Sequence, residues 1–279
     1  MTSSRSGAAA ARPDDALKVT DPPSITVVTP CLNAVDTIEE TLHSVRTQGY
    51  PRLEHVVVDG GSTDGTLDLL EATEGITWVS EPDGGRADAA NKGVRMSSGE
   101  IVAWLNADDR YEPGALSAVG EAFASHPEAM WVTGYCPIID ARGREIRGPV
   151  TRYKNFLLRR WSPSLYLTQN FVSDPATFVR RTALERVGPI SARWRWSHDY
   201  DLWLRVAALG SPVVIERDLA SFRMAAGSLS MTGFEEQFRE HAEVARLHGG
   251  EHRLAVAVNA TMSRLIVVIY RVMRRLAPA

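Results

Sequence analysis

The sequence has few cysteines and no excess of basic residues, and both shortages exclude classes of protein. Cys31 and Cys136 are the only cysteines among 279 residues, too few for a disulfide framework or a structural zinc site. The formal net charge is -3 and the isoelectric point is near 6.2, which argues against a nucleic-acid backbone as the principal partner. We therefore expect a soluble protein whose thiols are free and buried.

The common phosphate-binding and targeting signals are missing as well. The sequence has neither the glycine spacing of a dinucleotide-binding loop nor the lysine of a P-loop, so hydride transfer and ATP hydrolysis lose support. The alanine run from Ala8 to Ala11 is shorter than the hydrophobic region of a secretory signal. We interpret residues 1–23 as a disordered leader of a cytoplasmic protein.

From Ser24 onward, short β-branched runs alternate with longer segments of helical period. This alternation is typical of an α/β fold in which helices cover a sheet. The expected strands are Ile25–Thr29, His55–Asp59, Thr77–Ser80 and Ile101–Asn106, and the expected helices are Val35–Gln48, Asp64–Ala72, Ala87–Met96 and Pro113–Ser125. We expect residues 24–114 to form the nucleotide-binding half of one domain that spans residues 24–250.

Residues 115–250 are less regular, which suits the substrate-specific half of that domain. The expected elements here are a strand-like Trp131–Ile139, a helix over Asp199–Leu209, strands at Val213–Ile215 and Ala220–Met224, and a charged helix over Gly233–His248.

Residues 251–279 are expected to form a basic amphipathic helix. Apolar residues recur along it, four arginines follow Ser263, and Glu251 is its only acidic residue. Asn259, Ser263 and Arg264 interrupt the apolar run, so the helix is poorly suited to span a membrane. Two interpretations remain open: contact with an anionic membrane surface, or packing on the domain or on a second subunit.

Polar residues follow three of the four expected strands. The first strand runs into Thr29–Asn33, the second into Asp59–Gly65, and the fourth into Asn106–Asp109. Because ligands bind beyond the carboxyl ends of parallel strands, we expect these residues to meet in one cleft. A loop rich in acid and glycine, Ser80–Asp88, precedes Asn91 and Lys92.

The adjacent carboxylates Asp108 and Asp109 favour a divalent cation. Two carboxylates at a strand end repel each other unless a cation, an arginine or water neutralises them. Mg²⁺ or Mn²⁺ bound by one or two carboxylates, with phosphate oxygens completing the shell, is typical of a nucleotide site. In the alternative interpretation, Asp109 caps the following turn and Asp108 is solvated.

Four motifs in order resemble a known family. Thr29–Asn33 resembles its Pro-Thr-Tyr-Asn, Asp59–Thr66 resembles its Asp-Asp-Gly-Ser-Thr-Asp-Gly-Thr, Asp83–Gly93 resembles its loop and helix before the metal strand, and Ala103–Gly114 resembles its Asp-X-Asp strand. The stretch from Ser24 to Gly114 thus resembles the nucleotide-sugar-binding half of family 2 glycosyltransferases with the GT-A fold, a mixed α/β sheet flanked by helices. Asp174–Gly188 resembles the family's acceptor-side segment more loosely.

The resemblance implies an inverting enzyme that moves a sugar from a nucleoside-diphosphate sugar to an acceptor hydroxyl. It implies Asp108 and Asp109 as metal ligands for Mg²⁺ or Mn²⁺, with Asp108 also at the donor. Asp199, at the start of the Asp199–Leu209 helix, matches the family's general base, although a helix dipole also favours an acid there. The donor-binding residues it implies are Thr29, Asn33, Asp59, Asp83, Asn91 and Lys92, and Lys92 has a solvated surface position as its alternative.

Three positions depart from the family pattern. Gly60 stands where the family often has a second Asp that reads the nucleobase, so UDP, dTDP and GDP remain open. Asn106 replaces the first acid of Asp-X-Asp, and His198 replaces a Glu beside the base. In the family, a loop like the one that contains Arg223 and Ser228–Ser230 often folds over the diphosphate.

The Gln-X-X-Arg-Trp signature of processive synthases is absent, so the resemblance implies transfer of a single sugar, in cell-surface glycan or glycolipid synthesis. The acceptor is expected to be a carbohydrate or a lipid-linked molecule. Two other functions stay open: a sugar-phosphate nucleotidyltransferase and a non-catalytic module that binds nucleotide sugars.

Overall fold

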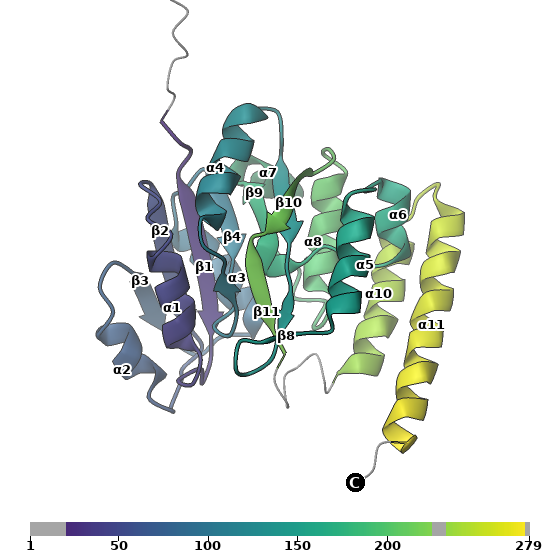
Figure 1. Ribbon diagram of the computed structural model, residues 1–279, viewed down its shortest axis with the longest axis horizontal. Coiled ribbons are helices and arrows are strands. Elements are labelled where there is room, and N and C mark those ends of the chain that lie inside the picture. The colour runs from purple at the N-terminus through teal and green to yellow at the C-terminus, as the bar shows by residue number, and fades with distance from the viewer. Residues whose placement is uncertain (1–20, 225–232, 277–279) are drawn as a thin grey trace, which may run out of the picture.

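A seven-stranded sheet forms the centre of the protein in the computed structural model, which describes residues 21–224 and 233–276 (Figure 1). The strand order is β10-β6-β9-β4-β1-β2-β3. The strands are β1 (Ile25–Cys31), β2 (Leu53–Asp59), β3 (Thr77–Ser80), β4 (Ile101–Trp104), β6 (Trp131–Tyr135), β9 (Thr177–Arg180) and β10 (Val213–Asp218). Strand β9 runs antiparallel to both neighbours and the other pairs are parallel, so the sheet is mixed.

Alternate residues of the central strands pack on opposite faces of the sheet, as the period of two requires. Ile25 and Val27 of β1 are fully buried in the core beneath α1 (Ile38–Arg46) and α4 (Ala115–Ser125). Val28 belongs to the core on the other face, beneath α3 (Arg86–Met96) and α8 (His198–Ala207). Trp203 of α8 stacks on Trp131 of β6 with ring centroids 6.1 Å apart, which fixes α8 against the sheet.

A second sheet of four short strands closes one end of the first. Its order is β5-β11-β7-β8, with β5 at Arg110–Tyr111, β7 at Ile138–Ile139, β8 at Glu145–Ile146 and β11 at Ala220–Arg223. The predicted strand Trp131–Ile139 is therefore split in two. The predicted strand Ile101–Asn106 ends at Trp104, which leaves Asn106–Asp109 in a turn between the sheets.

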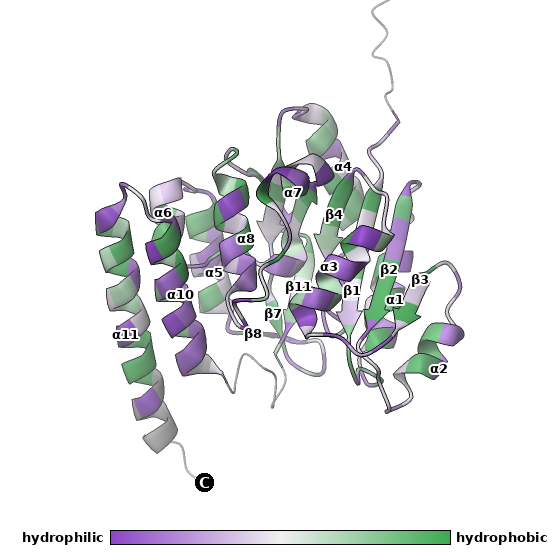
Figure 2. Cartoon of the chain, turned by 180° about the vertical axis from the view of Figure 1, so that it is seen from behind, coloured by the Kyte–Doolittle hydropathy of each residue, from purple (hydrophilic) through white to green (hydrophobic). Residues whose placement is uncertain are grey.

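Six further α-helices and one 3-10 turn complete the described residues. They are α2 (Thr66–Glu71), α5 (Gly148–Leu158), α6 (Pro163–Thr168), α7 (Arg181–Val187), α10 (Phe234–His248) and α11 (Arg253–Leu276), with a 3-10 turn at Asp174–Ala176. Figures 1 and 2 show α11 at the edge of the molecule farthest from β3. Among the described residues, no helix combines the length and apolar character needed to cross a bilayer.

Residues just before β1 are tied to the domain. Tyr50 donates a hydrogen bond to the Pro23 carbonyl at 2.7 Å, and Arg52 donates one to the Pro22 carbonyl at 3.0 Å. Residues 1–20 of the predicted leader lie outside the described residues.

Candidate active site

The carboxylate of Asp109 is committed to its own turn. The side chain is 1% exposed, one oxygen accepts from the Arg223 amide at 2.8 Å, and the other accepts from the Asn106 amide at 2.9 Å. Burial raises the pKa of Asp109 well above its usual range, and the neighbouring Asp108 carboxylate raises it further. Asp109 therefore holds the turn and β11 together, and its oxygens are not presented to a ligand.

Arg223 clamps the same turn from β11. Its guanidinium donates to the Asp108 carbonyl at 2.8 Å and to the Asp140 and Ala141 carbonyls at 3.1 and 3.2 Å, and it forms an ion pair with Glu40. These acceptors engage a side chain that is 3% exposed, so the geometry gives Arg223 a structural role rather than the diphosphate contact that the resemblance suggested. Ser228–Ser230 lies outside the described residues.

The side chains of Asp108 and Asn106 each offer an oxygen with which the turn could bind a ligand. Asp108 is half-buried; burial raises the pKa of its carboxyl, while the guanidinium groups of Arg86 and Arg223 oppose that rise. The side-chain oxygen of Asn106 is buried and has no hydrogen-bond partner in the described part of the chain. An unpaired amide oxygen beside a carboxylate suits a hard divalent cation. No group of three His, Cys, Asp or Glu side chains could hold a metal within residues 21–224 and 233–276, so an ion here would depend on oxygens of the donor.

Asp59 organises the loop after β2. Its carboxylate accepts from the amides of Gly61 and Ser62 at 2.9 and 2.8 Å, from Ser80 at 2.7 Å, and from the Ser62 hydroxyl. Burial opposes ionisation, but the bonds from Ser62 and Ser80 outweigh it and hold the pKa of Asp59 below its usual range. A fully buried carboxylate with these donors shapes the loop that would face the nucleoside.

Asn33 and Asp83 lie closer to solvent at the same edge. Asn33 has a positive φ of 49° and its side-chain oxygen accepts from the Thr63 amide at 2.9 Å, which joins the loops after β1 and β2. Asp83 accepts from the Gly85 amide at 2.7 Å. A Cβ added at Gly60 would lie 2.9 Å from an Asp83 carboxylate oxygen, so the Asp83 side chain occupies the space beside Gly60.

Three predicted donor-binding side chains have partners within the protein. The Thr29 hydroxyl is fully buried and bonds His55 at 2.9 Å inside the sheet. The Asn91 amide is used by the backbone of Ile190, with bonds of 2.8 and 2.9 Å. Lys92 forms an ion pair with Glu81. Sequence spacing could not show these partners, because Ile190 meets Asn91 only through the fold.

Asp199 lies across the cleft at the start of α8. It is half-buried and accepts from the Asn170 side chain at 3.1 Å. A narrow cavity connects it with Arg86 at the start of α3, and Asp174 and His198 also line that cavity. Asp199 thus lines a narrow cavity, where its carboxylate could accept a proton from a hydroxyl bound within hydrogen-bond reach.

Arg86 and Asp174 also line the site, although the sequence did not predict either of them. They form an ion pair. Burial raises the pKa of Asp174 to about 6, with Arg86 opposing the rise and Asp199 adding to it. Arg86 also acts on the pKa values of Asp108 and His198. Lone Arg and Asp residues carry no spacing signal, and the fold brings these two together across 88 residues of sequence.

His198 is uncharged at neutral pH. Burial, together with the nearby Arg86 guanidinium, lowers its pKa to about 4. The residue is 8% exposed in the wall of the cavity beside Asp199. It offers the cleft a neutral imidazole.

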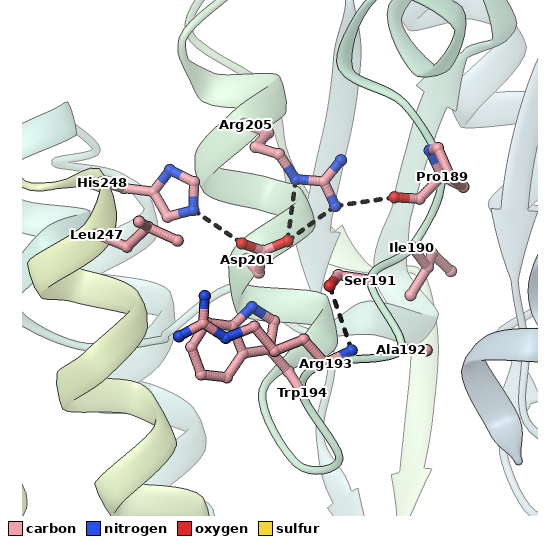
Figure 3. A pocket seen from close by; sticks show the side chains of 10 residues that line it. All are labelled: Pro189, Ile190, Ser191, Ala192, Arg193, Trp194, Asp201, Arg205, Leu247 and His248. Atoms are coloured by element: carbon pink, nitrogen blue, oxygen red, sulfur yellow. Dashed lines mark hydrogen bonds and ion pairs between the residues drawn. The ribbon is translucent and has the colours of Figure 1, made fainter.

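A larger hollow of about 500 Å³ lies between the Pro189–Trp194 loop, α8 and α10 (Figure 3). Its wall is built by Asp201, which accepts from Arg205 at 2.9 Å and contacts His248 at 2.8 Å. Ile190 lines both this hollow and the narrow cavity. The carboxyl ends of β1, β2 and β4 do not line the hollow, so we place the chemistry at the narrow cavity instead.

The family model of glycosyl transferase family 2 matches residues 26–188, which is more than half of the chain. The match includes Asp59, Arg86, Asp108 and Asp174 and ends before Asp199. The chain belongs to glycosyl transferase family 2. An uncharacterized glycosyltransferase of Mycobacterium tuberculosis, MT1564, is 31% identical over 210 residues, which are 73% of this chain and 76% of that protein. The putative teichuronic acid biosynthesis glycosyltransferase TuaG of Bacillus subtilis is 38% identical over 118 residues, covering 40% of this chain and 47% of TuaG.

Two solved structures share the fold. Residues 1–349 of S. aureus TarS in complex with UDP-GlcNAc align with a TM-score of 0.63 and 17% identity, over 81% of this chain and 66% of that one. The mannosyltransferase PcManGT from Pyrobaculum calidifontis, in complex with GDP-Man and Mn²⁺, aligns with a TM-score of 0.58 and 20% identity, over 90% and 80%. The protein is therefore a family 2 glycosyltransferase with the GT-A fold, and the expected mixed α/β class is confirmed.

Proposed function

We propose that this enzyme transfers a single sugar from a nucleoside-diphosphate sugar to an acceptor hydroxyl, with inversion at the anomeric carbon. The observation that carries the proposal is the place of Arg86 between Asp108 on one side of the cleft and Asp174 beside Asp199 on the other. A donor diphosphate near Asp108 and an acceptor near Asp199 would meet at this point. The complexes of TarS with UDP-GlcNAc and of PcManGT with GDP-Man support a donor of this class.

Asp108 and Asn106 would hold Mg²⁺ or Mn²⁺ together with the donor. When bound, a divalent cation neutralises charge on the departing nucleoside diphosphate. Its proposed protein ligands are the Asp108 carboxylate and the side-chain oxygen of Asn106. The Asp109 carboxylate orients Asn106 by accepting a hydrogen bond from its amide nitrogen. This assignment changes the predicted Asp108 and Asp109 pair into an Asn106 and Asp108 pair.

Asp199 is the proposed general base. The acceptor oxygen forms a bond to the anomeric carbon while the bond from that carbon to the diphosphate oxygen breaks, and Asp199 takes the hydroxyl proton. The Asn170 amide fixes one oxygen of Asp199 and leaves the other for the acceptor. Asp174 is less suited to this task because Arg86 already engages its carboxylate.

The family assignment favours glycosyl transfer over nucleotidyl transfer and over a non-catalytic module. The similarity to TuaG supports a role in cell-wall or polysaccharide synthesis, with a carbohydrate or lipid-linked acceptor. A cytoplasmic location and the boundaries at residues 23, 114 and 250 stay predictions. The nucleobase stays open, because Gly60 leaves Asp83 as the acid near that position.

A thermal-shift panel tests the donor side. UDP-, GDP- and dTDP-sugars are added with and without Mn²⁺, and a donor at 100 times its Kd should stabilise the protein by about 2.7 kcal/mol. We expect one nucleotide to stabilise the wild type in a Mn²⁺-dependent way and to leave Asp108→Asn unshifted. The proposal fails on the donor side if no nucleotide sugar gives a shift.

Replacement of Asp199 tests the base. Asp199→Asn should keep the donor-induced thermal shift and lose transfer by roughly a hundredfold or more, because the acceptor proton has no destination. Asp201→Asn is the matched control on the same helix, since Asp201 faces the larger hollow. NMR of the product would show the inverted anomer. Wild-type turnover in Asp199→Asn, or a retained anomeric configuration, contradicts the mechanism.

A further inference from the structure

Helix α11 carries a row of exposed apolar side chains. The row, called here the outer stripe, consists of Leu254, Val258, Leu265, Val268 and Ile269, whose exposed fractions run from 39% to 80%. Their spacing of three, four and seven residues places them on one side of the helix. Green, apolar turns recur along α11 at the edge of the molecule in Figure 2. Exposed apolar side chains gathered on one side of a helix are typical of a surface that meets a partner.

The opposite side of α11 is fixed to the domain. Ala255, Asn259 and Ser263 are buried, and the Asn259 amide donates to the Leu167 carbonyl at 3.0 Å. At its start, His252 bonds Ser164 at 2.9 Å. The packed side sets the rotation of the helix, so the exposure of the outer stripe follows from the fold.

Arginines flank the outer stripe. Arg253, Arg264 and Arg271 are exposed and are separated by eleven and seven residues, which puts them on one flank of the stripe. No acidic residue occurs between Arg253 and Leu276, although the whole chain has a net charge of -3. Arg271 pairs with Glu235 of α10, whereas Arg253 and Arg264 form no ion pair within residues 21–224 and 233–276. The positive charge beside the apolar row therefore comes chiefly from Arg253 and Arg264.

We propose that the outer stripe of α11 docks the protein on an anionic lipid bilayer, with the helix lying flat in the interface. Apolar side chains on one side and arginines on the flank are the features of an interfacial helix, in which the guanidinium groups contact lipid phosphates. The 24 residues of α11 extend about 36 Å, so the whole row can contact one flat surface. This inference concerns binding to a surface and is independent of the transfer reaction proposed above.

A second copy of the chain fits the outer stripe less well. In a two-fold pair of antiparallel α11 helices, the middle of each helix lies against the middle of the other. Arg264 stands at that point and would approach its own counterpart, with no acidic residue on the helix to separate the charges. An anionic surface meets Arg264 favourably.

Vesicle flotation of the full chain, without substrates, tests the proposal. We expect the protein to float with vesicles of phosphatidylcholine and phosphatidylglycerol and to stay unbound with phosphatidylcholine alone. Leu265→Glu should weaken binding roughly tenfold or more, because it places a charge in the apolar contact. Arg264→Gln should weaken it less and reduce its salt dependence. The control is Leu247→Glu, a 58% exposed leucine of α10 in the wall of the hollow in Figure 3, which should bind as the wild type does.

Other outcomes overturn the proposal. It is wrong if the wild type does not float with anionic vesicles, or if Leu265→Glu floats as the wild type does. Light scattering distinguishes the competing occupant: a dimer that Leu265→Glu separates, together with absence of flotation, would assign the outer stripe to a second copy. The unfolding temperature of each variant confirms its fold, and Arg264→Gln gives an independent test if Leu265→Glu is unstable.

Discussion

Arg86, the first residue of α3, forms an ion pair with Asp174 in the 3-10 turn before β9, although 88 residues separate the two in the sequence. The pair joins the nucleotide-side edge of the sheet to the segment that leads toward Asp199. Because Arg86 also lowers the pKa values of Asp108 and His198, its charge acts on both sides of the cleft. A bound diphosphate would compete with Asp174 for this guanidinium.

The pH dependence of stability should report on Asp174. Burial raises its pKa in the folded protein from the ordinary 3.8 to about 6, so folding favours the protonated form. The contribution of Asp174 to stability is thus present below pH 4 and is lost as the pH rises through about 6. In Asp174→Asn this loss should disappear. The difference in unfolding temperature, variant minus wild type, should increase between pH 4 and pH 6 and then stay constant; a flat difference contradicts the assignment.

The two neighbouring carboxylates should respond in opposite ways to substitution. Asp109→Ala removes the acceptor of the Arg223 and Asn106 amides, and we expect it to lower the free energy of unfolding by about 1–3 kcal/mol. Asp108→Asn should leave stability unchanged or raise it, because burial disfavours the charged form. Urea unfolding measures both. Asp108→Asn should lose the Mn²⁺-dependent thermal shift, and equal destabilisation by both variants would contradict the division of roles.

Gly60 should matter through Asp83. In Gly60→Ala the added Cβ would lie 2.9 Å from an Asp83 oxygen, so the carboxylate must move. We expect donor affinity to fall severalfold while the unfolding temperature changes little, because the contact is with the end of a side chain. Gly84→Ala is the control, since its Cβ would meet Asp88 at an ordinary 3.5 Å.

A double variant separates the contact from other effects of the methyl group. If Asp83 mediates the change, Gly60→Ala should have little further effect in an Asp83→Ala background. Isothermal titration of the nucleotide that is active in the thermal-shift panel measures all four proteins. Additive losses would show that Gly60 acts independently of Asp83.

The nucleotide-side fold could be predicted because its signals are local. Strand β3 has the predicted bounds Thr77–Ser80, and α3 begins one residue before the predicted Ala87. Near-continuous apolar runs mark strands buried on both faces, and β1 and β4 are of this kind. The polar residues that follow these strands could be predicted to meet at one edge of the sheet for the same reason.

The rest depended on contacts that the sequence does not display. Strand β9 has only four residues and owes its place to β4 and β6, so periodicity could not reveal it. Helices α5 and α6 lie in a stretch whose aromatic residues obscured the helical period. Within the site, the Asp-Asp spacing could not show that the Arg223 amide would bond Asp109 and that Asp108 would stay half-buried, since Arg223 lies 114 residues from Asp109.

Deletion of α11 would be a poor test of membrane docking. Removal of α11 would uncover Leu167 and Tyr200, which contact Asn259, and Tyr200 lies one residue from Asp199. Point substitutions in the outer stripe avoid this loss of core packing.

Acid unfolding should be governed by three buried histidines. Burial lowers the pKa values of His55, His198 and His241 from 6.5 to about 4 in the folded protein. Between pH 4 and pH 6.5, each imidazole is therefore neutral when the protein is folded and protonated when it is unfolded. Their contribution to stability is present above pH 6.5 and is lost as the pH falls toward 4. Uptake of three protons on unfolding corresponds to a slope of about 4 kcal/mol per pH unit in this window, which Asp174 partly offsets. His55→Gln should lower the slope by about one proton, whereas His126→Gln, at an exposed position, should not. Urea unfolding at several pH values gives the slope, and an unchanged slope in His55→Gln would mean that this imidazole is already charged in the folded protein.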